Sequence, residues 1–319
     1  MDAFWVMFRT IAIFLLLAVP GFILVKLKIM KDTDAAGLSK VLVYFGLPFQ
    51  TFTGTVDKLV LDGKMILLIA VSFVVGLVLT FLFFLVTKPL TAMEKDPETR
   101  GVIRFSSALS NNGFLGIPLA AAVFGDGKVL ALVIVLNIAT NIMMYTVGRV
   151  VIGGGREKMD FKKAFLNPVL IAFILGLAAN ALGLKKVLPE VSTYSAYFAG
   201  VVAPLSMTVA GIQLGSVSLK KLFGSGKVYY VSALKLLLLP AAVTAVMLLA
   251  KLLIPGAFID GEAVMAFFIA FAMPTAGLAT TFAVQFKSDK ETATTCMLGT
   301  TVLAVLTVPL LYWAVSAIL

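Results

Sequence analysis

The feature that most constrains this chain is a series of apolar segments, each of roughly 20 residues, the length of a helix that crosses a bilayer. Ten such segments can be counted along the 319 residues, of which 61% are hydrophobic. The expected spans are residues 4–25, 36–54, 64–87, 101–124, 128–151, 167–184, 194–215, 227–253, 262–286 and 291–317. The chain is therefore predicted to be an all-α integral membrane protein without a soluble domain.

One segment, residues 106–125 with the sequence SSALSNNGFLGIPLAAAVFG, is apolar enough for a membrane but unsuited to a continuous helix. Low helix propensity is shared by Asn111, Asn112, Gly113 and Gly116. Pro118 lacks the backbone N–H that a helix interior requires. We expect the helix to be interrupted between about Asn111 and Pro118.

A second segment, residues 267–284, has the same character, because Pro274 is followed by Thr275 and Gly277. In hydrocarbon, an interrupted helix survives only where protein or a water-filled cavity satisfies its backbone groups. Two interrupted helices that reach the middle of the membrane are typical of the binding site of a transporter. The sequence thus predicts that the fourth and ninth helices are broken and form such a site.

Basic residues set the expected orientation. Connections after odd-numbered spans carry 18 of the 26 Lys and Arg residues, and connections after even-numbered spans carry 6. Because positive charge is retained in the cytoplasm, both termini are expected outside a multi-pass protein of the plasma (inner) membrane.

The chain divides into two halves of five spans. We expect a first repeat at residues 1–152, a cytoplasmic linker at 153–166 and a second repeat at 167–319. Since five is odd, the two repeats enter the membrane from opposite sides and are inverted relative to each other. The prolines agree with this pairing, because Pro48 and Pro204, like Pro118 and Pro274, are separated by 156 residues.

Three motifs carry a resemblance to a known family: SNNGFLGIPLA, VVAPLSMTVAGIQLG at 201–215, and AMPTAGLATTFAVQF before a Thr-rich last helix. Together they resemble the auxin efflux carrier family, which includes plant PIN proteins and bacterial malate and malonate permeases. The resemblance implies two inverted five-helix repeats whose broken helices four and nine cross at their prolines. It also implies a scaffold of helices one, two, six and seven that forms a homodimer, with the other helices as a mobile transport domain. The short linker resembles that of the bacterial members.

Candidate substrate-binding residues lie at the two breaks and on two other spans. They are Asn111, Asn112, Gly113, Pro118, Asn137, Asn141, Lys235, Pro274 and Thr275. The two asparagines at the first break could contact a ligand or could cap helix ends. Asn137 and Asn141 share one helix face, where interhelical hydrogen bonds are as good an explanation as a site.

Other polar residues receive weaker assignments. Lys235 lies deep in the eighth span, where it could snorkel to the cytoplasm or face a cavity and attract an anion. Gln50 and Gln213 could line a cavity from scaffold helices. Four threonines of the last span, Thr294, Thr295, Thr300 and Thr301, are expected to be packing residues.

Composition excludes several kinds of partner and site. The net charge of +10 reflects short basic loops rather than one basic face, so no nucleic-acid partner is expected. Without histidine, and with Cys296 as the single cysteine, the chain offers no imidazole metal site and no intrachain disulfide. Acidic residues are confined to loops and span edges, so a carboxylate-based cation site is not expected. Neither a cofactor nor an enzymatic activity is predicted.

We therefore expect a secondary transporter, either an efflux carrier or a permease, that moves a small organic anion such as a carboxylate by alternating access. One alternative is a sodium-coupled organic-anion symporter of the bile-acid type. Another is a membrane receptor or channel that binds a ligand at the same crossing without carrying it. The expected partners are the small anion, the lipid bilayer and a second copy of the chain.

Overall fold

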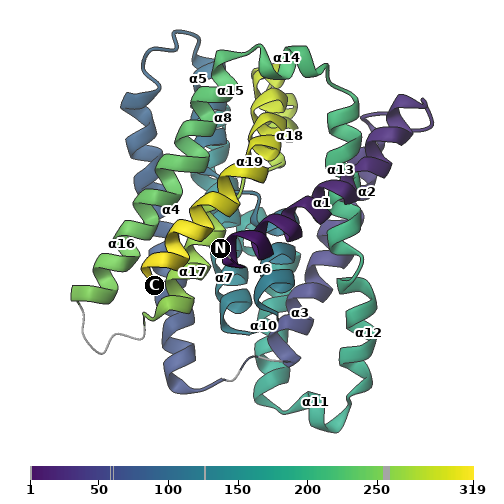
Figure 1. Cartoon of the computed structure of the whole chain (residues 1–319), viewed down its shortest axis with the longest axis vertical. Helices are drawn as coiled ribbons and strands as arrows, with labels where there is room; N and C mark the ends of the chain where they lie inside the picture. Colours follow the sequence, from purple (N-terminus) through teal and green to yellow (C-terminus); the bar gives the residue numbers. More distant parts are fainter. Residues whose placement is uncertain (1, 58, 60, 126, 254–258) are drawn as a thin grey trace.

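The computed structural model describes residues 2–57, 59, 61–125, 127–253 and 259–319, which are helical apart from turns, short loops and one isolated β-bridge (Figure 1). The helices of the first half, in chain order, are α1 (Asp2–Lys26), α2 (Asp34–Val41), η1 (Leu42–Gly46), α3 (Leu47–Asp57), α4 (Gly63–Leu90), α5 (Pro97–Ala108), η2 (Asn112–Gly116), α6 (Ile117–Phe124), α7 (Lys128–Met143), η3 (Met144–Gly148) and α8 (Arg149–Ile152). Those of the second half are α9 (Phe161–Phe165), α10 (Pro168–Ala181), α11 (Leu184–Val187), α12 (Glu190–Ala199), α13 (Val202–Gly215), α14 (Leu219–Phe223), α15 (Gly226–Ser232), η4 (Ala233–Leu238), α16 (Leu239–Leu253), α17 (Gly261–Ala272), α18 (Leu278–Gln285) and α19 (Lys290–Ile318). The elements η1 to η4 are π-helical turns.

Seven helical stretches within the described residues are long and apolar enough to cross a membrane. They are Trp5–Lys26, Gly63–Leu90, Lys128–Ile152, Phe161–Ala181, Glu190–Gly215, Gly226–Leu253 and Lys290–Ile318. Each coincides with one predicted span. The other three predicted spans correspond to the continuous run α2–η1–α3 and to two pairs of shorter helices, α5 with η2–α6 and α17 with α18.

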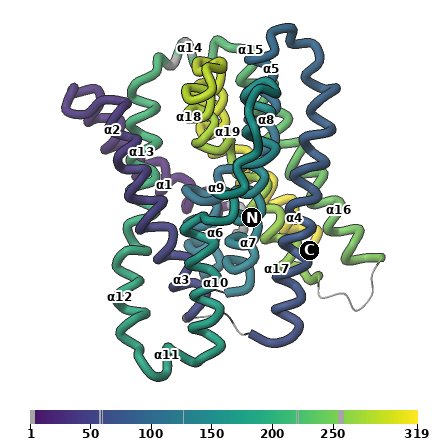
Figure 2. Tube along the Cα trace, turned by 180° about the vertical axis from the view of Figure 1, so that it is seen from behind, coloured from purple at the N-terminus to yellow at the C-terminus, as the bar shows by residue number. Residues whose placement is uncertain are grey.

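The helices form two groups that lie on opposite sides of the molecule. In the first group, α1 packs along α13, and α3 packs against α10 and α12. In the second group, α7 packs against α4, α6 and α17, while α19 packs against α15 and α18. Figures 1 and 2 show α3, α12 and α13 on one side, and α4 and α16 on the other. The first group contains the helices predicted to form the scaffold.

Nearly every residue of α7 is buried, which makes this helix the centre of the second group. The contact between the two groups is formed by α1, α3 and α13 of the first group with α6, α7, η2 and α19 of the second. Residues that contact each other across this boundary are therefore the ones that any relative movement of the groups would affect.

Helices α1 and α13 approach so closely that only glycine fits at their crossing. A Cβ atom at Gly211 would overlap the carbonyl oxygen of Ala18, and a Cβ atom at Gly21 would overlap that of Thr208. Small residues at a helix crossing are how membrane helices gain backbone contact and dispersion energy, since the hydrophobic effect does not drive association in lipid. This glycine contact holds the first group together.

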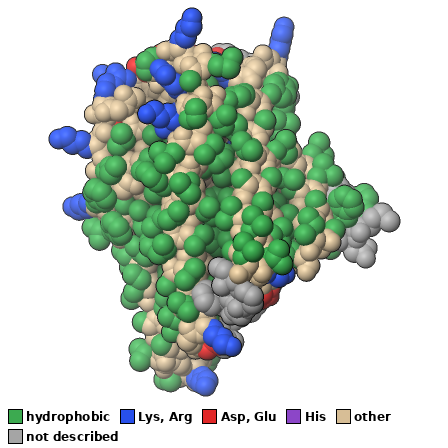
Figure 3. All heavy atoms as spheres, turned by 90° about the vertical axis from the view of Figure 1, so that its left-hand side faces the viewer, with side chains coloured by type: hydrophobic (Ala, Val, Ile, Leu, Met, Phe, Trp, Pro, Cys, Tyr) green, Lys and Arg blue, Asp and Glu red, His purple; other side chains and the backbone are tan. Residues whose placement is uncertain are grey.

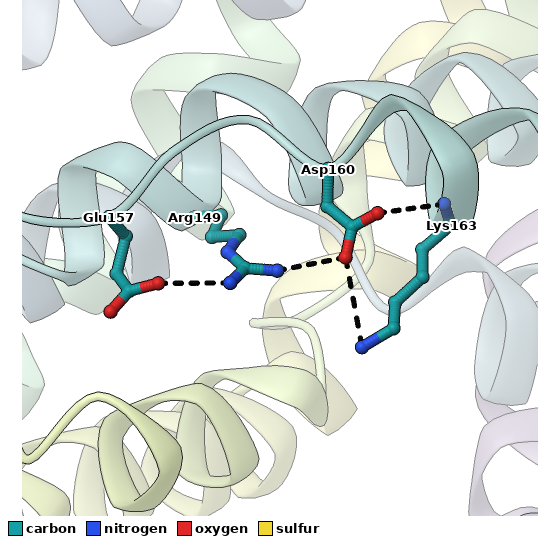
Figure 4. A network of polar contacts seen from close by, with 4 residues as sticks. All are labelled: Arg149, Glu157, Asp160 and Lys163. Atoms are coloured by element: carbon teal, nitrogen blue, oxygen red, sulfur yellow. Dashed lines mark hydrogen bonds and ion pairs between the residues drawn. The ribbon is translucent and has the colours of Figure 1, made fainter.

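The linker after α8 is bound to the second group by ion pairs (Figure 4). The guanidinium of Arg149 donates to Glu157 and to Asp160, both at 2.9 Å. The backbone N–H of Asp160 donates to the carbonyl of Tyr145 at 2.9 Å. The backbone N–H of Lys163 donates to the Asp160 carboxylate and, with nearby cations, holds the pKa of that carboxyl below its ordinary value. The linker is therefore a docked segment.

The surface agrees with a membrane location. Figure 3 shows one face on which hydrophobic side chains cover the middle, while Lys and Arg side chains stand out in the upper part and at the lower tip. Exposed large apolar residues include Leu16 at 67% and Leu252 at 74%. A broad exposed apolar surface is expected where lipid is the solvent.

The glycine contact leads to a test of the first group. Gly211→Ala should lower the apparent unfolding temperature, because the new methyl group forces α1 and α13 apart and such overpacking costs about 1–3 kcal/mol. Gly37→Ala is the matched control, since no atom lies within 4 Å of a Cβ there and the change adds helix propensity. Thermal unfolding of the purified protein at one scan rate distinguishes them. Equal melting behaviour in both variants would contradict the role given to Gly211.

Candidate functional site

The two predicted breaks meet in the middle of the second group. Helix α5 ends at Ala108, residues 109–111 are not helical, and helical structure resumes with η2 at Asn112. Helix α17 ends at Ala272, and α18 begins at Leu278. The two non-helical segments pair as a single antiparallel β-bridge between Ser110 and Thr275.

Two backbone hydrogen bonds close this bridge. The N–H of Asn111 donates to the carbonyl of Pro274 at 2.8 Å, and the N–H of Ala276 donates to the carbonyl of Leu109 at 3.0 Å. Each segment thus supplies partners that the other needs, which is how non-helical backbone is tolerated at membrane depth. The paired residues 109–111 and 274–276 are called the crossing below.

The first break lies earlier than the sequence indicated. It was expected between about Asn111 and Pro118, whereas residues 112–116 form the π-helical turn η2 and Pro118 lies in the first turn of α6. Since η2 continues directly into α6, Pro118 lies inside a continuous helical stretch, and the π-helical turn before it accommodates the N–H that proline lacks. The break instead falls where the backbone N–H of Asn111 can donate to Pro274 in the other non-helical segment. Helix propensity contains no information about such a distant partner.

Threonine side chains secure the second break. The hydroxyl of Thr275 donates to the carbonyl of Ser106 at 2.8 Å, and its N–H donates to the hydroxyl of Thr300 at 3.1 Å. Thr275 and Thr300 are fully buried. Thr300, expected only to pack, therefore takes part in holding the crossing.

A buried polar cluster lies beside the crossing, between η2 and α7. The amide Nδ2 of Asn112 donates to the hydroxyl of Thr140 at 3.2 Å, while its Oδ1 has no hydrogen-bond partner. Asn137 is 3% exposed, and its Nδ2 also has no partner. A Cβ atom built on Gly113 would lie 3.6 Å from Oδ1 of Asn137, so Gly113 keeps η2 and α7 close. Buried amide atoms without partners mark a place where a ligand can bind.

Lys235 is fully buried and reaches the crossing from the π-helical turn η4. Its ammonium donates to the hydroxyl of Ser110 at 2.5 Å and to the carbonyl of Phe271 at 3.1 Å. The side chain therefore does not reach the cytoplasmic surface. It binds next to the carboxyl ends of α5 and α17, where the helix dipoles concentrate partial negative charge.

Four helix ends with opposite partial charges converge at the crossing. The carboxyl ends of α5 and α17 are partially negative and have the Lys235 ammonium beside them. The amino ends of η2 and α18 are partially positive. Within the described residues, no group of three or more His, Cys, Asp or Glu side chains could hold a metal ion. The arrangement favours an anion at the amino ends.

The predicted site residues fall into two sets. The crossing and the adjoining polar cluster contain Asn111, Asn112, Gly113, Asn137, Pro274 and Thr275, and Lys235 contacts the crossing through Ser110. Pro118 lies about two turns beyond Ser110 along η2 and α6, and Asn141 lies about one turn beyond Asn137 on α7.

Three residues that hold the site were not anticipated: Ser110, Thr140 and Thr300. Thr140 follows Asn137 by three residues and directly precedes Asn141, so its position on the same helix face could have indicated it. Ser110 directly precedes the two asparagines of the break. Nothing distinguishes Thr300 from the other threonines of its helix in the sequence.

A pair of serines tests the role of the Lys235 contact. Ser110→Ala removes a hydrogen bond to a buried ammonium and should destabilise the protein by about 1.5–3 kcal/mol. Ser107→Ala is the control, because that serine is also buried but its hydroxyl has no partner. Thermal unfolding of the two variants under identical conditions compares them directly. If Ser107→Ala were as destabilising as Ser110→Ala, the ammonium contact would not support the crossing.

Comparison with known proteins identifies the family. The chain resembles an uncharacterized transporter of Methanothermobacter thermautotrophicus, with 26% identity over 96% of this chain and 97% of that protein. It also resembles an uncharacterized transporter of Methanocaldococcus jannaschii, with 28% identity over 66% of this chain and 70% of that protein. A family model described as membrane transport protein matches twice, at residues 6–164 and 156–312. The chain therefore belongs to the membrane transport protein family, that of the auxin efflux carriers, and is a transporter rather than an enzyme.

Proposed function

We propose that this membrane transporter is a secondary carrier of a small organic anion, with a carboxylate as the first candidate, and that it works by alternating access. The observation that carries the proposal is the crossing, where the amino ends of η2 and α18 lie together with two asparagines that each have one amide atom without a hydrogen-bond partner, Oδ1 of Asn112 and Nδ2 of Asn137. Helix amino ends and amide N–H groups are suited to bind a carboxylate.

The charges around the crossing support an anion. Lys235 lies at the negative helix ends, and in its ammonium form it gives the crossing a positive charge. No acidic residue occurs in the sequence between Glu98 and Gly125 or between Ala263 and Lys287, which are the stretches that form the crossing. A bound carboxylate would therefore meet no nearby negative side chain from these segments.

We further propose that α5 with η2–α6, and α17 with α18, each form one crossing of the membrane. With α2–η1–α3 and the seven long helices, this gives ten crossings in two inverted repeats of five. Two successive matches to one family model, with a boundary at the linker, support this arrangement.

Alternating access would use the boundary between the two helical groups. A cavity with mainly apolar walls lies there, lined by residues that include Phe14, Leu115, Met207, Met273 and Thr301. Phe14 and Met207 come from the first group, whereas Leu115, Met273 and Thr301 come from the second. Movement of the second group against a fixed first group would carry the crossing past this boundary. Formation of a homodimer through the first group rests on the family resemblance.

The position of Lys235 also helps to decide whether transport is coupled to sodium. A sodium-coupled carrier would need oxygen ligands for its cation, and the Ser110 hydroxyl and Phe271 carbonyl are oxygens of that kind. In this chain both oxygens accept hydrogen bonds from Nζ of Lys235. We therefore favour transport without sodium over the sodium-coupled symporter.

Counterflow in liposomes tests the function. Wild-type protein should take up a labelled carboxylate from a panel of acetate, malonate, succinate and benzoate faster when the same unlabelled compound is loaded inside. Equal uptake with and without sodium is expected. A channel or a receptor would show no acceleration by the internal compound, and such a result across the panel would overturn the proposal.

A pair of asparagines tests the site. Asn111→Ala should raise KM by about tenfold or more, the equivalent of one hydrogen bond to a charged group, without a change in unfolding temperature. Asn180→Ala is the control, since its amide donates to the carbonyls of Thr55 and Leu59 within the first group. That variant should unfold at a lower temperature with KM unchanged. A wild-type KM in Asn111→Ala would place the site elsewhere.

The proposed orientation is tested by labelling. In a Cys296→Ala background, a membrane-impermeant maleimide added to intact cells should modify Lys186→Cys but modify Lys158→Cys only after permeabilisation. Both positions are exposed, one between the sixth and seventh predicted spans and the other in the linker. The opposite labelling pattern would place the termini inside.

A further inference from the structure

Three amide side chains with unpartnered buried atoms come from both sides of the group boundary. They are Gln50 of α3, whose Oε1 has no hydrogen-bond partner, and Asn112 and Asn137 of the second group. Buried amides in folded proteins are almost always hydrogen-bonded, so an unpartnered set calls for a missing partner. The two asparagines belong to the site already described, whereas Gln50 does not.

The packing of α3 places Gln50 next to those asparagines. A Cβ atom on Gly113 would lie 3.2 Å from Cδ1 of Leu47, so Leu47 touches η2 at the point where Asn137 also approaches. Two turns later, Gly54 faces Leu130 and Ile134 of α7, at 3.1 and 3.6 Å from a Cβ atom. Gln50 follows Leu47 by three residues and precedes Gly54 by four, so it lies between these two contacts on the same side of α3.

Other residues of α3 contact α12 and α10. These contacts show that the side of α3 that carries Gln50 does not face either helix. Phe49 stacks on Phe198 of α12, and the hydroxyl of Thr53 donates to Ser195 of the same helix. Thr55 contacts Gly176 of α10. Gln50 thus lies on the side of α3 that faces η2 and α7 rather than α10 and α12.

We propose that Gln50 is a substrate-contacting residue, the hydrogen-bonding contribution of the first group to a carboxylate that Asn112 and Asn137 bind from the second. This assignment rests on the proposed function. A half-turn about its last side-chain bond exchanges the oxygen and nitrogen of the Gln50 amide, so the side chain can donate an N–H to the carboxylate. The substrate then joins the two groups, and the Gln50 bond must break when the second group moves.

This role differs from that of the asparagines. Asn112 and Asn137 would travel with the substrate, whereas Gln50 would contact it on one side of the cycle only. The polar contact of Gln50 would therefore favour binding in the conformation described here, where α3 lies against η2 and α7.

The test compares Gln50→Leu with Thr51→Val. Thr51 is the matched control, because its hydroxyl is also buried without a partner but points about 100° further around α3. With the carboxylate that the wild-type protein carries in counterflow, Gln50→Leu should raise KM by about tenfold or more. It should also abolish the rise in unfolding temperature that this carboxylate produces, while the unfolding temperature of the unliganded protein stays the same. Thr51→Val should change neither quantity.

Gln50→Glu keeps the size of the side chain. It provides a second test in case Gln50→Leu does not fold. It places a negative charge beside an anion, so affinity should fall further than in Gln50→Leu. A KM within twofold of wild type in both Gln50 variants would overturn the assignment and leave the proposed function standing. If the wild-type protein carries no carboxylate of the panel, the proposed function falls and the assignment of Gln50 falls with it.

Discussion

The structure depends on the mutual satisfaction of backbone groups at the crossing. A helix that ends in hydrocarbon leaves polar N–H and C=O groups without partners, at several kcal/mol for each group. Here the backbone of Asn111 bonds to Pro274 and that of Ala276 bonds to Leu109, so neither non-helical segment could persist without the other. The remaining helices of the second group enclose this pair. A site built in this way can expose helix ends to a ligand while the helices around it remain intact.

Electrostatics then divides the crossing into two parts. Lys235 binds at the carboxyl ends of α5 and α17, which supplies the cation that those ends attract. The amino ends of η2 and α18 have no acidic residue in their own segments. In its ammonium form, Lys235 can do for the helix dipoles what a bound metal cation does in other carriers, and this is the physical basis for proposing an anion without a coupled sodium ion.

The two helical groups differ in how they are held together. The first group relies on backbone contact at Gly21 and Gly211 and on hydrogen bonds such as those of Asn180, all of which are internal to the group. At its boundary with the second group, helices α1 and α13 contact α6, η2 and α19, and an apolar cavity lies beside these contacts. The two groups are thus packed together without filling all the space between them. Such a distribution suits a protein in which one part moves against another.

The sequence by itself determined the class of protein. Apolar segments of membrane length, and the lack of acidic residues within them, predicted a helical membrane protein, and the family followed from three motifs. Propensity also predicted interruptions between about Asn111 and Pro118 and at Pro274; the second is observed, whereas the first falls at residues 109–111. These are local properties, because an unpaired N–H or a proline ring acts on its own turn of helix.

Only the tertiary structure decided which groups meet. The first break begins at Leu109, earlier than predicted, because the bond from Asn111 to Pro274 comes from a segment more than 160 residues away. The same holds for the partners of Lys235, for the contact of Thr300 with Thr275, and for the position of Gln50 beside η2. Sequence patterns report which face of a helix is polar, whereas hydrogen bonds between distant segments depend on how the helices pack. Local sequence thus determines the spans and the approximate places of the breaks, and packing determines where each break falls and which residues form the site.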